Sequence, residues 1–384
     1  MQYKKLGSTN LELSILGFGC MRFPASNADT AANHLQLKID EKKSREMIEY
    51  AIANGVNYFD TGYMYHSGES EKFVGKVLKQ GFRDKIKLAT KLPFFFINEK
   101  NDMNRILNEQ FERLQTDYFD LYLMHGINKD SWERAKSLGA IEFIEKMKKQ
   151  GRAKYIGFSF HGSADDFIYL IDDYDWDFTQ IQYNYYDTNY QAGKKGLKYA
   201  YEKGMGVVIM EPLRGGMLTD LPEDILNVFK RSDKYKTPAE WGLRWVWNHN
   251  EVSSVLSGMS SMEQLKENIE IANSVKTGDF TPENNSIIND VISSLKTKLK
   301  INCTNCAYCL PCPYGVNIPQ CFAFYNDLFL FNDDKTSRMR YTFMLRPENK
   351  ASNCKACGEC VKKCPQQINI IEQLASVKNE FEKV

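Results

Sequence analysis

Short apolar runs alternate with amphipathic stretches along the first two thirds of the chain. The runs have the length of buried strands, and the stretches between them, such as SREMIEYAIANG, show helical spacing and often end in Gly or Asn. After a first strand in LELSILGFGC, the predicted strands are 56–60, 86–91, 119–125, 155–159, 178–184, 207–211 and 254–258. Eight strand and helix units in about 260 residues fit a closed (β/α)8 barrel of the TIM type better than an open doubly wound sheet.

Polar side chains stand at the carboxyl ends of these predicted strands. In a barrel of this type the active residues come from those ends, so they are the first candidates for a site. The polar residues at the predicted strand ends are Asp60, Lys91, His125, Ser159, Asn184 and Glu211.

The stretch YFDTGYMYHSGESE, residues 58–71, concentrates the candidate chemistry. Asp60 ends a predicted strand and Tyr65 follows on the loop before an amphipathic helix, so an acid and a phenol share one rim. A tyrosine has an ordinary pKa of about 10 and is a poor proton donor near neutral pH unless a nearby cation stabilises its phenolate. The structural alternative is that Asp60 caps a turn and Tyr65 only packs on the rim.

Charge and composition narrow the class of function. The 384 residues include 50 basic and 49 acidic ones, and a net charge of +1 gives no reason to expect nucleic acid or an anionic membrane as partner. The start MQYKKLGSTN lacks the apolar core of a signal peptide, and no run approaches the roughly 18 apolar residues of a membrane span, so we expect a cytoplasmic protein with a small-molecule substrate. Gly17 and Gly19 do not begin a dinucleotide-binding fingerprint, because its third glycine would fall at Arg22.

Four residues resemble the catalytic positions of the aldo/keto reductase family: Asp60 and Tyr65 in DTGYMY, Lys91 in LATKLP and His125 in LYLMHG. The resemblance covers roughly residues 1–275 and implies hydride transfer from NADPH or NADH to a carbonyl, with Tyr65 as proton donor. A lysine cation about 4 Å from a phenolate contributes up to about 4 kcal/mol at an effective dielectric constant near 20, which would lower the pKa of the phenol by roughly three units. Asp60 would keep Lys91 charged, and His125 would bond the substrate carbonyl. Taken singly, Lys91 is more often a solvated strand end and His125 a satisfied core histidine.

The same resemblance implies a set of cofactor contacts. Ser159 in GFSFHG and Gln182 in QIQYN match residues that hold the nicotinamide carboxamide, although each would also serve as a routine buried hydrogen-bonding residue. Met210 stands where the family often has an aromatic residue that stacks on the nicotinamide, and its polarizable sulfur can also pack on a ring. In SGMSSMEQLKEN the residues that match the adenosine-phosphate loop are Gly258, Ser260, Ser261, Gln264, Glu267 and Asn268. Many NADP-specific members have a basic residue where Gln264 stands, so the choice between NADP and NAD is open. NADP is the expectation and NAD the alternative.

The cysteines mark a second module, since nine of the ten lie between Cys303 and Cys364. A polar linker and one amphipathic helix precede them and are expected to connect to the barrel and pack on it. We therefore divide the chain into a barrel at residues 1–278, a connecting helix at 279–300 and a cysteine-rich domain at 301–384.

Two cysteine runs, CTNCAYCLPCP and CKACGECVKKCP, have ferredoxin-like spacing and predict two 4Fe-4S clusters. Because two-cluster ferredoxins take the fourth ligand from the other motif, one cluster is assigned to Cys303, Cys306, Cys309 and Cys364, and the other to Cys354, Cys357, Cys360 and Cys312. The first run departs from the usual pattern by one residue before its last cysteine, which leaves open which cluster Cys312 joins. Two structural zinc sites are the alternative, although those usually use paired cysteines.

The whole chain resembles an iron-sulfur branch of the aldo/keto reductases, a barrel followed by a ferredoxin-like domain. The aromatic stretch CFAFYNDLFLFN between the cysteine runs favours a mostly helical domain. Carbonyl reduction in the barrel needs no cluster, so the clusters would serve electron transfer, with a partner protein, or structure. The alternative function is an electron-transfer protein that uses the barrel as a docking scaffold, and the complete set of four catalytic residues argues against it.

Overall fold

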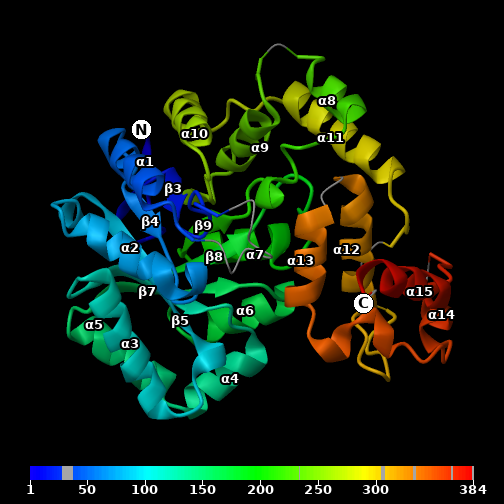
Figure 1. Cartoon of the computed structure of the whole chain (residues 1–384), viewed down its shortest axis with the longest axis horizontal. Coiled ribbons are helices and arrows are strands. Elements are labelled where there is room, and N and C mark those ends of the chain that lie inside the picture. The colour runs from blue at the N-terminus through cyan, green and yellow to red at the C-terminus, as the bar shows by residue number, and fades with distance from the viewer. Residues whose placement is uncertain (28–37, 233, 304–307, 332–333, 365, 383–384) are drawn as a thin grey trace. The chain divides into compact units, whose positions relative to one another are not determined.

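The structure, a computed structural model, describes all residues except 28–37, 233, 304–307, 332–333, 365 and 383–384 (Figure 1). The chain divides into two compact units by the contacts within it. The first unit comprises Met1–Gly215 and Tyr235–Thr281, and the second comprises Gly216–Lys234 and Pro282–Val384. A segment between two barrel elements therefore belongs to the second unit.

Eight parallel strands close into a barrel in the first unit. Each strand pairs with the next one along the chain, and the last pairs with the first. The strands are β3 (Leu16–Gly19), β4 (Tyr58–Asp60), β5 (Lys87–Pro93), β6 (Phe119–His125), β7 (Ala153–Phe160), β8 (Phe178–Gln182), β9 (Gly206–Met210) and β10 (Ser254–Ser257). The predicted TIM-type barrel is confirmed, and each of the eight predicted strands overlaps one of these.

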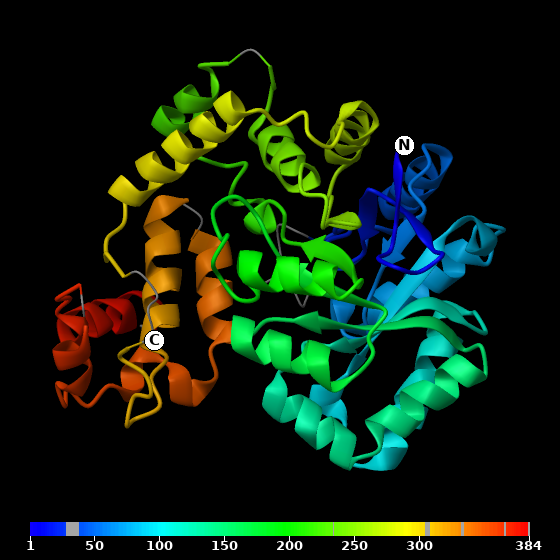
Figure 2. The ribbon, with the colours of Figure 1, turned by 180° about the vertical axis from the view of Figure 1, so that it is seen from behind.

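Helices cover the outside of the ring of strands (Figures 1 and 2). In the first unit they are α1 (Glu41–Ala53), α2 (Glu69–Leu78), α3 (Lys100–Leu114), α4 (Lys129–Ser137), α5 (Ala140–Lys149), α6 (Ala164–Asp173), α7 (Gly193–Glu202), α9 (Pro238–Trp247) and α10 (Met262–Ser274). Helix α3 illustrates the amphipathic spacing from which the helices were predicted. It buries Met103, Ile106, Leu107 and Leu114 on one face.

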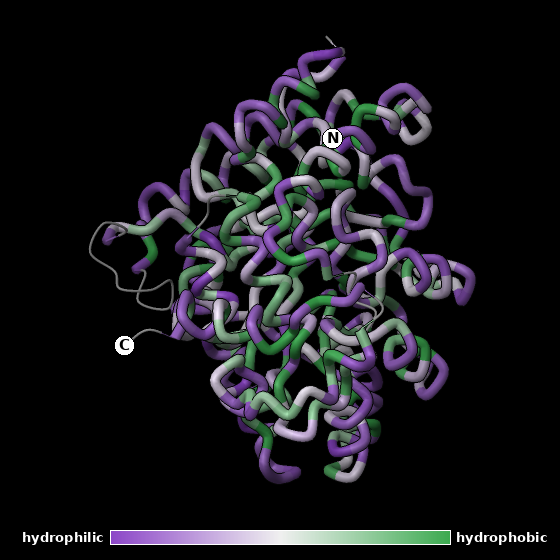
Figure 3. Tube along the Cα trace, turned by 90° about the vertical axis from the view of Figure 1, so that its right-hand side faces the viewer, coloured by the Kyte–Doolittle hydropathy of each residue, from purple (hydrophilic) through white to green (hydrophobic). Residues whose placement is uncertain are grey.

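A hairpin of β1 (Tyr3–Lys5) and β2 (Glu12–Ser14) closes the amino end of the barrel. Leu6 and Leu13 of this hairpin pack into the same core as Tyr58 and Val208 from the strands. The approach is so close that a Cβ at Gly7, where φ is +56°, would lie 2.3 Å from the Gly206 nitrogen. The opposite, carboxyl end of the barrel carries the candidate site residues. In Figure 3 the hydrophilic residues lie mostly on the outer turns of the trace and the hydrophobic ones mostly inside it.

The second unit is mostly helical, as predicted. Its helices are α8 (Glu223–Phe229), α11 (Pro282–Thr297), α12 (Ile318–Leu330), α13 (Asp334–Met344), α14 (Glu359–Lys363) and α15 (Ile370–Phe381). Helix α11, the predicted connecting helix, packs against α8, which comes from the segment between β9 and α9. Phe322, Tyr341 and Leu374 share one core, and most of the described cysteines pack against it.

None of the helices in the described part of the chain has both the length and the apolar character that crossing a membrane requires.

Candidate active site

Lys91 of β5 lies at the centre of the polar rim and is 1% exposed. Its Nζ donates hydrogen bonds to the Asp60 carboxylate, to the Thr61 carbonyl oxygen at 2.8 Å and to the Tyr65 hydroxyl at 3.0 Å. Burial would by itself lower the pKa of Lys91, but the charges of Asp60 and Tyr65 raise it above its ordinary value. The amine therefore stays charged beside the phenol.

The second carboxylate oxygen of Asp60 has two partners that the sequence did not predict. The Tyr58 hydroxyl donates to it at 3.3 Å and the Gln180 amide at 3.1 Å. Gln180 lies on the same face of β8 as Gln182, because alternate residues of a strand share a face. That alternation is a signal by which Gln180 could have been found from the sequence.

Tyr65 begins a short turn that follows β4. A Cβ at Gly62 would lie 3.1 Å from the Tyr65 ring, so the glycine leaves the space in which the phenol packs. Burial raises the pKa of Tyr65, and the neighbouring Lys91 cation lowers it less than burial raises it. The prediction that Lys91 lowers the pKa of the phenol holds for that one interaction, while the net shift is upward. Tyr65 therefore stays protonated near neutral pH.

His125 ends β6 and faces the phenol. Its ring centroid lies 6.1 Å from that of Tyr65 in an edge-on arrangement and 5.7 Å from that of Phe95. Burial, the Lys91 cation and His161 lower the pKa of His125 to about 3, so the imidazole is neutral. Its Nδ1 is buried and has no hydrogen-bond partner among the described residues.

A buried polar network supports Lys91 from behind, and the sequence did not predict it. The Gln110 amide of α3 donates to the Lys91 carbonyl oxygen at 3.0 Å and to the Glu71 carboxylate at 2.9 Å. Thr90 also donates to Glu71, at 2.6 Å, and the Tyr122 hydroxyl donates to the Gln110 carbonyl oxygen at 2.8 Å. Because α2, α3, β5 and β6 each supply a member, the network fixes the strand end that carries Lys91.

The backbone directly after Tyr65 is strained. His66 and Ser67 have φ of 51° and 57°, in the left-handed region that non-glycine residues rarely adopt. His66 is buried, and its Nε2 accepts a hydrogen bond of 3.3 Å from the Phe23 backbone N–H. Strained residues of this kind cost of order 1–3 kcal/mol each and cluster at functional sites. The turn that sets the position of Tyr65 is therefore held by surrounding structure.

The predicted cluster ligands lie in the second unit. Cys306 falls outside the described residues, six of the other seven pack against the helical core, and Cys357 is exposed. Burial raises the pKa of the Cys360 thiol, and the neighbouring Cys354, Cys357 and Cys312 raise it further. The Ala356 backbone N–H donates to the Cys354 sulfur at 3.5 Å. No group of three or more such side chains has metal-binding geometry in the described ranges.

Profiles of known protein families match both the barrel and the cysteine-rich part of the chain. The profile described as Aldo/keto reductase family matches residues 15–291, more than half of the chain. This chain belongs to the aldo/keto reductase family. The profile described as 4Fe-4S dicluster domain matches residues 302–369, so this aldo/keto reductase carries a ferredoxin-type domain after its barrel.

Individual relatives cover the barrel. L-Galactose dehydrogenase of Arabidopsis thaliana is 28% identical over 318 residues, covering 77% of this chain and 96% of the relative. The probable aldo-keto reductase 1 of Glycine max is 27% identical over 304 residues, covering 70% of this chain and 84% of the relative. Among solved structures, the holo form of aldo-keto reductase AKR11C1 from Bacillus halodurans aligns with a TM-score of 0.61 at 28% identity, covering 76% of this chain and 96% of that one.

The residues predicted to hold the nicotinamide lie on three adjacent strands of this aldo/keto reductase. Ser159 of β7 accepts a hydrogen bond from the Gly126 backbone N–H at 2.8 Å. The Gln182 amide nitrogen donates to Asp187 at 2.9 Å, while its Oε1 is buried without a partner among the described residues. Met210 pairs with Gln182 across β8 and β9 and is partly exposed. Their role as cofactor contacts stays a prediction.

The predicted phosphate loop follows β10 and enters α10. Ser261 caps the helix by accepting from the Gln264 backbone N–H, and the Ser260 backbone N–H donates to the Gln264 side chain at 2.9 Å. Glu267 accepts a bond of 2.5 Å from Thr237, and Asn268 donates to the Ser257 hydroxyl at 3.0 Å. Gly258, Ser260 and Gln264 are exposed. These hydrogen bonds therefore hold the loop in place. Its role in cofactor binding also stays a prediction.

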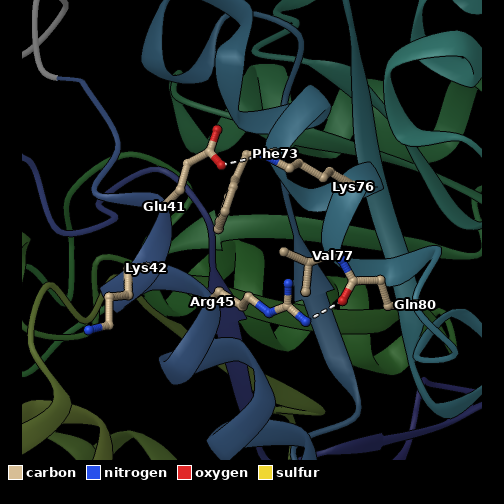
Figure 4. Close-up of a pocket in the computed structure, with 7 residues that line it drawn as sticks. All are labelled: Glu41, Lys42, Arg45, Phe73, Lys76, Val77 and Gln80. Atoms are coloured by element: carbon tan, nitrogen blue, oxygen red, sulfur yellow. Dashed lines mark hydrogen bonds and ion pairs between the residues drawn. The ribbon is translucent and has the colours of Figure 1, made fainter.

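A surface groove between α1 and α2 lies apart from these residues (Figure 4). Three of its four charged side chains have partners, since Lys76 bonds Glu41 at 2.5 Å and Arg45 bonds Glu49 at 2.8 Å, and the fourth is Lys42. Phe73 and Val77 form its apolar side. The groove therefore presents no cluster of reactive groups comparable to the one around Lys91.

Proposed function

We propose that this chain is an NAD(P)H-dependent carbonyl reductase in which Tyr65 is the proton donor. The observation that carries the proposal is the Lys91 amine, which bonds Asp60 and the Tyr65 hydroxyl at the same time inside a water-poor site. Tyr65 would give its proton to the carbonyl oxygen, and a bound nicotinamide would supply the hydride for the carbonyl carbon. The products are an alcohol and the oxidised cofactor.

The charges around Tyr65 suit that proton transfer. The phenol is protonated in the resting protein because burial raises its pKa. The Lys91 cation, 3.0 Å away, stabilises the phenolate that remains after the proton has left. Asp60 keeps the lysine charged and oriented. These roles require the side chains of Asp60, Lys91 and Tyr65 to remain buried together.

His125 suits the placing of the substrate carbonyl. A pKa lowered to about 3 keeps its ring neutral, so the ring donates one N–H and does not compete with Tyr65 as an acid. Its ring lies edge-on to the Tyr65 ring with the centroids 6.1 Å apart, which supports a substrate position near both side chains. A carbonyl oxygen there would accept from both, as polarisation of the carbonyl requires.

The nicotinamide carboxamide has matching groups on the rim. A carboxamide offers one acceptor oxygen and one donor NH2 group. The Ser159 oxygen already accepts from the Gly126 N–H, so its own O–H is available as a donor, and Gln182 Oε1 is an unpaired buried acceptor among the described residues. The Gln182 orientation is settled by chemistry, since only its NH2 can donate to the Asp187 carboxylate. This donor and acceptor pair supports a nicotinamide cofactor.

For the second unit we propose two 4Fe-4S clusters with the ligand sets given by the sequence. The electrostatic influence of Cys312 on Cys360 supports the crossed set that places Cys312 with the second run. The N–H bond to the Cys354 sulfur is of the kind that stabilises a thiolate ligand. The clusters would supply one-electron transfer or structural support there.

The test is anaerobic purification followed by stopped-flow mixing with NADPH and then with 4-nitrobenzaldehyde as a reactive carbonyl probe. Absorbance of the reduced nicotinamide and of the clusters is followed together. Nicotinamide oxidation that depends on the aldehyde, with 1:1 formation of alcohol, supports the reductase. Cluster reduction by an external one-electron donor with no nicotinamide binding would instead support an electron-transfer protein with a docking barrel.

A further inference from the structure

Glu71 of α2 is a buried carboxylate that accepts hydrogen bonds on both of its oxygens. Its Oε1 accepts from the Thr90 hydroxyl at 2.6 Å and from the Gln110 amide at 2.9 Å. Its Oε2 accepts from the Arg113 guanidinium at 3.2 Å. Helices α2 and α3, which supply the carboxylate and two of these donors, pack against each other on the outside of the barrel (Figure 1). Glu71 therefore joins the start of α2 to both β5 and α3.

Two of the three donors lead to Lys91. Thr90 directly precedes Lys91 in β5, and the Gln110 amide that bonds Glu71 also donates to the Lys91 carbonyl oxygen at 3.0 Å. The Tyr122 hydroxyl donates to Gln110 Oε1 at 2.8 Å, which fixes the orientation of that amide. The strand end that carries the Lys91 amine is therefore tied to the Glu71 carboxylate.

The third donor leads to the loop that carries Tyr65. Arg113 also donates to the main-chain carbonyl oxygen of Tyr63 at 3.2 Å, two residues before Tyr65. This bond reaches the main chain and does not depend on the Tyr63 hydroxyl. Glu71 itself lies in the first turn of α2, directly after the turn that begins with Tyr65. One carboxylate therefore holds both chain segments that meet in the 3.0 Å hydrogen bond between Lys91 and Tyr65.

We propose that Glu71 is a positioning residue of the reduction, which acts by setting the contact between the Lys91 amine and the Tyr65 hydroxyl. The inference rests on the proposed function, in which the Lys91 cation stabilises the phenolate that proton transfer leaves on Tyr65. Hydrogen bonds weaken steeply when they are misaligned, and the attraction between charges falls with distance. A small displacement of either segment would therefore slow proton transfer while it leaves the binding of the reactants little changed.

Asp120 of β6 offers a matched control at the other end of β5. It is also buried, and it accepts from the Arg83 guanidinium, the Leu88 backbone N–H and the Lys154 amine, each at 3.0 Å. Arg83 precedes β5, and Leu88 and Lys154 lie at the amino ends of β5 and β7. Asp120 therefore braces the same strand and pairs with an arginine as Glu71 does, but at the end of the strand opposite the candidate site.

The test uses Glu71→Gln and Asp120→Asn in the full-length, anaerobically purified protein. The rate constant of NADPH oxidation in a single turnover at saturating 4-nitrobenzaldehyde measures the chemical step apart from product release. Glu71→Gln keeps an oxygen that can accept from Thr90 and Gln110, but it loses its charge and turns an NH2 group toward Arg113. We expect this rate constant to fall about tenfold, with the dissociation constant of NADPH and the half-saturating aldehyde concentration within about twofold of wild type.

The control variant separates positioning from stability. Both substitutions weaken a buried ion pair, so both should lower the melting temperature by several degrees. Asp120→Asn should nevertheless keep the wild-type rate constant. The inference is overturned if Glu71→Gln also keeps the wild-type rate constant, or if Asp120→Asn loses as much of it as Glu71→Gln does.

Thr90→Val carries the test if Glu71→Gln does not fold. It keeps the shape of the side chain and removes one donor to Glu71, so the rate constant should fall about threefold, and an unchanged rate constant would overturn the inference. Failure of the proposed function is recognised separately, because the wild-type protein would then not oxidise NADPH with the aldehyde at all. In that case the inference falls with the function on which it rests.

Discussion

The barrel site and the cysteine-rich unit are built in different ways. In the barrel, Lys91 already has Asp60, Thr61 and Tyr65 as partners, and a buried network fixes the strand that carries it. In the second unit, six of the predicted ligand cysteines pack against one small helical core. The first site is held by hydrogen bonds among its own residues, whereas we expect the second to depend on its clusters, as metal binding and folding are coupled in small ligand-rich modules.

The largest expected effect is loss of fold in the second unit when iron is removed. Anaerobic protein should contain about eight iron and eight sulfide per chain, and chelation or air should bleach it and unfold the region after Ile301. The barrel should keep its structure because its own core holds it. Hydrogen exchange before and after chelation measures both units at once. If the second unit showed equal protection from hydrogen exchange before and after chelation, its fold would not depend on iron and the contrast between the two sites would be lost.

Substitution at Tyr65 should damage the barrel site alone. Tyr65→Phe keeps the ring and removes the proton donor, so carbonyl reduction should fall by about two orders of magnitude or more with little change in cofactor affinity. Tyr63→Phe is the matched control, since that hydroxyl bonds Glu109 at 2.6 Å and takes no part in the Lys91 contacts. Iron content should be unchanged in both variants. Undiminished turnover in Tyr65→Phe would refute the proposed proton donor.

Two truncations sharpen the boundary between the units. A chain ending after Lys300 keeps α11 against α8 and should fold and bind nicotinamide. A chain ending after Thr281 loses α11 and exposes the buried Ile225 and Phe229 of α8, so its melting temperature should fall by several degrees and its solubility should drop. Thermal melts and NADPH binding of the two proteins measure the difference. If the chain ending after Lys300 is insoluble or cannot bind cofactor, the barrel is not an independent domain.

The barrel could be predicted from local signals, whereas the four proposed catalytic positions needed the strand ends together with the resemblance to the aldo/keto reductase family. Apolar runs report buried strands, and Asp60, Lys91 and His125 stand at or near their ends. Gln110 was not predicted, since its contact with Lys91 depends on how α3 meets β5. The left-handed turn at His66 was also hidden, because histidine carries no glycine signal for positive φ.

The smallest expected effect is that of pH on turnover at the barrel site. We predict almost no change in the turnover number across the neutral range. His125 has its pKa lowered to about 3 by burial, Lys91 and His161, so it carries no proton to lose between pH 5 and 8. The Tyr65 pKa is raised above its ordinary 10.0 by burial, against the opposing effect of Lys91, so the proton donor is lost only as pH rises beyond that value. The turnover number should therefore stay level from about pH 5 to pH 9 and fall at higher pH. A pH series with a saturating carbonyl probe measures it, with His125→Asn as the control that cannot titrate in this range. A fall in turnover below about pH 6.5 that disappears in His125→Asn would show that the folded chain does not hold the imidazole neutral. The barrel site would then not be preformed, and its contrast with the cysteine-rich unit would be lost.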